Sequence, residues 1–200
     1  MKILWCIIII LLTSFSSKKQ LVINYAKESI GIQDAYAKYD ALFSKHPEFI
    51  SKDFDFPVGK PNGKGYYNAQ KFKSNNHLGD DWNGVGGGNS DLGDSIYSIA
   101  NGYVSFAEDI GGGWGNVIRI IHKYKDKYYE SLYAHCKTIT IKAGDFVKKG
   151  DLIGTIGNAD GLYLAHLHLE IRDDIFMGIG GGYSENTKGY LDPTKFINEN

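Results

Sequence analysis

The sequence predicts a mainly β fold, an antiparallel sheet of the barrel or sandwich kind built from short strands. Fourteen Tyr, ten Phe and 25 Gly among 200 residues are typical of strands joined by glycine-containing turns. Residues 165–172 alternate with a strand's period of two: Leu167, Leu169 and Ile171 fall on one face. The length suits one main domain, which we place at residues 56–200.

The N-terminus has the pattern of a secretory signal over residues 1–17. An apolar run at 3–12 follows Lys2 and precedes a small polar run. About ten apolar residues are too few to span a bilayer, which needs roughly 20. We expect cleavage near Ser16, with retention as an uncleaved anchor as the alternative. Any membrane contact is expected only through this segment.

Charge and cysteine content exclude two further classes. A net charge of -1 gives no basic surface for nucleic acid, so no nucleic-acid partner is expected. Cys6 lies in the predicted signal, which leaves Cys136 without a disulfide partner. We expect Cys136 to be a buried thiol.

Residues 18–55 are predicted to form a helical extension. Apolar residues recur at spacings of four, three and four and are followed by Pro47; they are Ile32, Tyr36, Tyr39 and Phe43. The amphipathic helix is expected to pack on the main domain or, alternatively, to cover a site there. Residues 56–76 show no period and are interpreted as an irregular lead-in.

The main domain is predicted to contain successive short strands. Asn101-Gly102 predicts a hairpin between 95–100 and 103–107, and Lys125-Asp126-Lys127 predicts another between 116–124 and 128–135. Further strands are expected at 138–142, 145–147 and 152–156. Asp192-Pro193 predicts a capped helix over 194–198.

Three glycine clusters, at 84–88, 111–115 and 178–182, interrupt the strands. The first does not open a helix within a strand-helix-strand unit, so a nucleotide loop is rejected. A calcium loop starting at Asp81 is also rejected, because no Glu closes it. We interpret all three clusters as rims of a groove.

The histidines indicate where chemistry is concentrated. His46 and His122 are interpreted as structural; His77, His135, His166 and His168 remain. An HxH pair on a strand is two surface histidines, a pair of metal ligands, or one ligand beside a proton-transfer group. Together with His77 and the Asp80-Asp81 pair, it predicts a nitrogen and oxygen site suited to zinc. From residue chemistry alone, either aspartate and either histidine of the pair remain candidates.

Three motifs, in order, resemble the lysostaphin/LytM-type peptidoglycan metalloendopeptidases (metallopeptidase family 23). They are His77-Leu78-Gly79-Asp80-Asp81-Trp82, Leu132-Tyr133-Ala134-His135 and His166-Leu167-His168-Leu169-Glu170. Supporting similarity occurs at 101–104, 113–117, 142–150 and 154–157, so the resemblance covers about residues 75–172. Residues 158–165 depart from the family, many members of which have a shorter Ser/Thr-Gly-Pro approach. This departure affects the groove rim and hence substrate preference.

The resemblance implies a role for each motif residue. One Zn²⁺ per chain would be held by His77, Asp81 and His168, with His135 and His166 as the catalytic histidines. Asp80 would then be a solvated carboxylate or one placed behind the ligands.

Two further side chains near the motifs have two interpretations each. Glu170 would orient a histidine or form a surface pair with Arg172. Tyr133 would line the groove or pack in the core.

The implied function is that of a zinc metalloendopeptidase, secreted or held in the periplasm or cell envelope. It would hydrolyse peptide bonds in peptidoglycan cross-links. The alternative is a non-catalytic module of the same fold that binds cell wall or activates an amidase. A purely structural zinc site is a weaker third interpretation. The bond cleaved, the oligomeric state and a dampening role for residues 21–60 are left open by the sequence.

Overall fold

The computed structural model describes residues 35–200, so the predicted signal and Ile32 lie outside the described part. The chain divides into two compact units, residues 1–47 and 48–200. Residues 35–45 of the first unit are helical and include Tyr36, Tyr39 and Phe43 of the predicted period. Within residues 35–200, no helix is long and apolar enough to cross a membrane.

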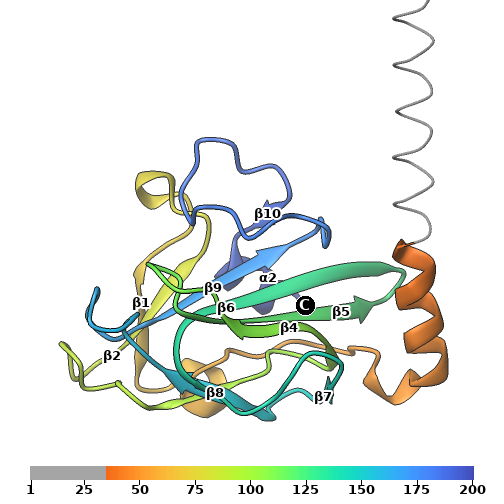
Figure 1. Cartoon of the computed structure of the whole chain (residues 1–200), viewed down its shortest axis with the longest axis horizontal. Helices are drawn as coiled ribbons and strands as arrows, with labels where there is room; N and C mark the ends of the chain where they lie inside the picture. The colour runs from red at the N-terminus through yellow and green to blue at the C-terminus, as the bar shows by residue number, and fades with distance from the viewer. Residues whose placement is uncertain (1–34) are drawn as a thin grey trace, which may run out of the picture. The chain divides into compact units, whose positions relative to one another are not determined.

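The second unit is built on an open sheet whose ten strands all pair antiparallel, which confirms the predicted mainly β class (Figure 1). Its main strand order is β1-β2-β9-β6-β5-β4-β7, with β10 on β9 and β8 joining β3 to β6. The strands are β1 (Tyr66–Gln70), β2 (Asp80–Gly84), β3 (Ser95–Tyr97), β4 (Gly102–Asp109), β5 (Asn116–Tyr124), β6 (Lys127–Ile139), β7 (Phe146–Val147), β8 (Leu152–Ile156), β9 (Leu167–Arg172) and β10 (Tyr190–Leu191). Short helical turns lie at η1 (Pro47–Phe49), η2 (Gly59–Gly63) and η3 (Ser74–Asn76).

One of the two predicted hairpins is confirmed and the other is wrong. β5 and β6 pair up to Tyr124 and Lys127, around the predicted turn. β3 and β4 do not pair with each other: β3 pairs with β8, and β4 with β5 and β7. A Cβ on Gly102 would lie 2.6 Å from Ile120 and 2.7 Å from the Ile121 carbonyl oxygen. The glycine therefore allows close strand packing and does not form a turn.

The expected irregular lead-in contains a strand, and the predicted C-terminal helix is present. Residues 66–70 form β1, so the expectation of an irregular lead-in is wrong there. The predicted helix is confirmed as α2 (Pro193–Glu199), capped by Asp192, which accepts from the Lys195 amide.

Asp80 is buried and anchors two segments, so the expectation of a solvated carboxylate is wrong. One oxygen accepts from the Phe72 amide, and the other accepts from both the amide and the hydroxyl of Thr194. These bonds tie β2 to α2 and to the turn before His77.

β9 lies between β2 and β6, which brings the sequence motifs together. Asp81 and Ala134 both stand opposite His168 in register. Leu167, Leu169 and Ile171 enter the hydrophobic core, as the alternation predicts. The polar face is buried as well, and Glu170 and Arg172 have no exposed surface.

Candidate metal centre

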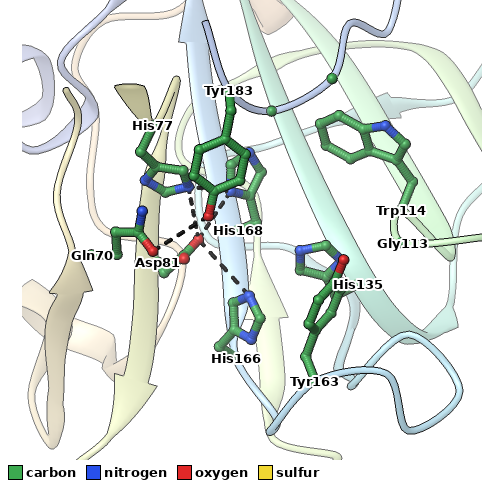
Figure 2. A pocket seen from close by; sticks show the side chains of 12 residues that line it. Gln70, His77, Asp81, Gly113, Trp114, His135, Tyr163, His166, His168 and Tyr183 are labelled. Atoms are coloured by element: carbon green, nitrogen blue, oxygen red, sulfur yellow. Dashed lines mark hydrogen bonds and ion pairs between the residues drawn. The ribbon is translucent and has the colours of Figure 1, made fainter. Parts of the chain in front are cut away.

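His77, Asp81 and His168 bring one donor atom each to a common point (Figure 2). His168 Nδ1 lies 2.9 Å from Asp81 Oδ1 and 3.0 Å from His77 Nε2. His77 Nε2 lies 3.3 Å from the same Asp81 oxygen. His77 follows η3, while the other two residues are held by the β2–β9 register.

The spacing of these donors fits a tetrahedral zinc site. Ligand distances of about 2.0–2.1 Å correspond to tetrahedron edges of roughly 3.3 Å. Two imidazole nitrogens and one carboxylate are also donors that zinc prefers, and three protein ligands leave a fourth position open.

Electrostatics at this point favour positive charge. Burial alone would lower the pKa of His168, but hydrogen bonds to Asp81 and Glu170 raise it to about 9. Burial raises the pKa of Asp81, yet hydrogen bonds to His168 and His77 hold it well below its usual range. The groups therefore attract a proton or a metal cation.

His135 and His166 flank the three donors. Their ring centroids lie 4.7 Å apart, and His166 Nε2 is 3.9 Å from Asp81 Oδ1. His166 Nδ1 donates to the Leu164 carbonyl, which leaves Nε2 free to accept a proton. Burial, together with the nearby His166 and His168, lowers the pKa of His135 to about 3, so its ring is neutral.

All five predicted site residues line one cavity of about 410 Å³. Gly113, Gly181 and Gly182 also line it, so two of the three glycine clusters border the cavity. Among the described lining residues, none belongs to the cluster at 84–88.

The remaining lining residues are aromatic or polar, and sequence reasoning did not select them as site residues. They are Gln70, Trp114, Tyr163 and Tyr183. The signals were indirect: Trp114 lies within a glycine cluster and the supporting similarity at 113–117, Tyr163 lies in the segment that departs from the family, and Tyr183 follows a glycine cluster.

The family model of peptidase family M23 matches residues 81–181, just over half of the 200 residues. The chain belongs to peptidase family M23. The match includes Asp81, His135, His166 and His168, while His77 lies four residues before its start.

Curated relatives of this M23 chain match over 80 residues. Lipoprotein NlpD of Yersinia enterocolitica is 40% identical, over 40% of this chain and 78% of that protein. The murein hydrolase activator NlpD of Escherichia coli is 39% identical, over 40% of this chain. The matched segment spans only a fifth of the length of that relative, 20%.

Solved structures show the same M23 fold at low identity. Lysostaphin from Staphylococcus simulans aligns with a TM-score of 0.53 at 22% identity, covering 68% of this chain and 52% of that one. The catalytic domain of a mutant of the prophage-encoded M23 protein EnpA from Enterococcus faecalis aligns with a TM-score of 0.50 at 22% identity, covering 70% of this chain and 95% of that domain.

Within this M23 domain, Tyr133 belongs to the core and does not line the cavity. It is fully buried, and its hydroxyl accepts from the Ile99 amide and lies 3.1 Å from the Ser131 hydroxyl oxygen. Strand β6 has one extra residue opposite β5 just before Cys136, and His135 has φ of +60°. This β-bulge breaks the period of two, so His135 faces the cavity while Tyr133 does not.

The buried thiol is confirmed: Cys136 is free, and burial raises its pKa to about 12. Glu170 combines both interpretations given for it. It accepts from His168 Nε2 at 3.1 Å and from Arg172 Nε at 2.8 Å, but the pair is buried and does not lie at the surface. Glu170 therefore holds His168 with Nδ1 facing the other donors.

Proposed function

We propose that the chain is a zinc metalloendopeptidase that hydrolyses peptide bonds in peptidoglycan cross-links. The observation that carries the proposal is the convergence of His77, Asp81 and His168 beside two further histidines in one open cavity. Membership of peptidase family M23 and the murein-related names of the relatives support this substrate class. The lipoprotein relative fits a secreted or envelope location.

The proposed mechanism assigns separate tasks to the protein groups. His77, Asp81 and His168 would hold zinc, which when bound acidifies water and polarises the scissile carbonyl. His166, whose Nδ1 donates to the Leu164 carbonyl, would accept a proton through Nε2. His135 keeps a neutral ring that donates a hydrogen bond to the developing oxyanion.

The first test separates metal binding from chemistry. The purified chain is expected to hold one zinc by elemental analysis and to release soluble fragments from cell walls. His168→Ala should abolish both, because it removes a ligand. His135→Ala should keep the zinc and lose at least about 100-fold in hydrolysis, the scale of general acid-base catalysis. Undiminished wall digestion by His168→Ala would refute the assignment.

A non-catalytic role is the second candidate, favoured by the relatives that are named murein hydrolase activators. An activator would stimulate a murein amidase without releasing peptide fragments itself. It would also keep this effect in His135→Ala. Mass spectrometry of fragments from defined walls, with and without an amidase, distinguishes the two functions.

A further inference from the structure

One wall of the cavity is the loop that joins β9 to β10. Its residues Gly181, Gly182 and Tyr183 line the cavity, and Figure 2 shows the Tyr183 side chain extending from this loop to the His77 ring. The groove wall, defined here as residues 178–183, is attached to the rest of the domain at two points. Each point of attachment leads to a different candidate metal ligand.

The first attachment is through the backbone around His77. A β-bridge joins His77 to Tyr183, and the Leu78 amide donates to the Gly182 carbonyl at 2.9 Å. The Tyr183 ring also packs on the His77 ring, with centroids 5.1 Å apart. The end of the groove wall is therefore fixed to the turn that carries one ligand.

The second attachment is the guanidinium of Arg172. Nη1 donates to the Gly178 carbonyl at 2.9 Å, and Nη2 donates to the Ile179 carbonyl at 2.8 Å. The same group donates through Nε to Glu170, whose other oxygen accepts from His168. One side chain thus links a ligand imidazole to the start of the groove wall.

The hydrogen bonds made by the side chain at position 172 require an arginine. Arg172 has no exposed surface, and its donors also reach Glu130, at 3.4 Å. A planar fork with five donors can serve two carboxylates and two carbonyls together, whereas a lysine ammonium concentrates three donors on one atom. Burying the charges of Arg172, Glu170 and Glu130 costs free energy. Loss of one member would therefore leave the others buried without a full set of partners.

We propose that Arg172 is a positioning residue that couples the metal centre to the groove wall. It holds His168 through Glu170 and the wall through two carbonyls, so filling the metal site orders residues 178–183. Displacement of the wall in turn weakens metal binding. The inference rests on the proposed zinc site and extends it to the formation of the substrate groove.

A matched pair of variants tests the coupling. The described chain has a second arginine of similar setting, Arg119, which donates to the Met177 carbonyl and pairs with Glu130 but does not contact Glu170. Zinc affinity is measured by competition with a chromogenic chelator. Arg172→Lys is expected to weaken zinc binding by about 10–100-fold, the usual cost of losing a partner behind a ligand. Arg119→Lys is expected to leave it nearly unchanged.

A role in stability alone would give a different result. Arg172→Lys would then lower the unfolding midpoint while keeping the zinc affinity of the parent chain, and this would overturn the inference. Equal weakening of zinc binding by both variants would also overturn it.

The coupling between the metal centre and the groove wall can also be tested on the parent chain, even if Arg172→Lys fails to fold. Amide hydrogen exchange of peptides covering residues 176–184 is compared with zinc and with a chelator. Slower exchange with zinc is expected, and unchanged exchange in a zinc-bound chain would refute the coupling alone. A parent chain that binds no zinc would instead refute the proposed function.

Discussion

Two buried histidines of this domain, His122 and His168, differ in the groups that surround them. Neither is exposed by more than 3%. His122 Nδ1 donates to the Asn101 carbonyl and Nε2 accepts from the Ser131 hydroxyl, each at 2.7 Å. His168 instead lies between the carboxylates of Asp81 and Glu170.

The pKa values of the two rings move in opposite directions. Burial lowers the pKa of His122 to about 4, whereas the carboxylates overcome burial and raise that of His168 to about 9. Burial alone therefore makes a neutral, structural histidine, and paired carboxylates make a site for positive charge. Access differs too: the Phe54 ring packs edge-on against His122, while His168 borders the open cavity.

The largest effect is expected from removing the charge of Asp81, which makes the surroundings of His168 more like those of His122. Asp81→Asn should weaken zinc binding by more than about 100-fold, because it alters a proposed ligand and not merely the support behind one. The adjacent Asp80 is the matched control. Asp80→Asn should keep zinc affinity but lose about 1–3 kcal/mol of unfolding free energy, since its oxygens serve buried donors.

Chelator competition measures zinc binding and urea unfolding measures stability for both aspartate variants. Equal loss of zinc affinity in Asp80→Asn and Asp81→Asn would contradict this prediction. In that case, burial and strand geometry would control the site more than the charge next to His168.

The second prediction concerns acid stability. The folded pKa of His122 is about 4, below the usual histidine value of 6.5, so the folded state binds fewer protons between these pH values. Stability from this group is complete above pH 6.5 and is lost as pH falls toward 4, amounting to about 3 kcal/mol. The difference in urea stability between the parent chain and His122→Gln, measured with a chelator from pH 8 to 4, should therefore shrink on acidification. A difference that stays constant with pH would show that burial does not keep this ring neutral.

Sequence periodicity predicted much of the sheet because the core strands obey it. The β5–β6 hairpin and the alternation in β9 follow directly from local pattern. The pairing partners of β3 and β4 did not follow, because Gly102 permits close packing against Ile120 and Ile121, a long-range requirement with the same local signature as a turn.

The candidate site was predictable only where a motif carried it. His77, Asp81, His135, His166 and His168 stand in motifs and meet in one cavity. The bulge that turns Tyr133 away has no sequence signal. The two contacts of Glu170 were among the sequence interpretations, but the burial of Glu170, Arg172 and Glu130 was not expected, because charged residues on a strand normally indicate a solvated face.

The smallest effect is expected from Gly113, which lines the cavity. Gly102, a buried glycine of β4, serves as the comparison. A Cβ on Gly113 would lie 2.5 Å from the Tyr163 hydroxyl, which can move, whereas one on Gly102 would meet the Ile121 carbonyl and His122 Nδ1 at 2.7 and 2.8 Å. Gly113→Ala should change KM for wall peptides only a few-fold and leave stability intact. Gly102→Ala should instead lose about 1–3 kcal/mol of unfolding free energy through overpacking.

Tyr163→Phe provides the control for the rim, because it removes the hydroxyl and leaves the next ring atom 3.6 Å from the added Cβ. The effect of Gly113→Ala on KM should therefore disappear in the Tyr163→Phe background, as measured by a double-mutant cycle. Additive effects would mean that Tyr163 does not transmit the change to the cavity.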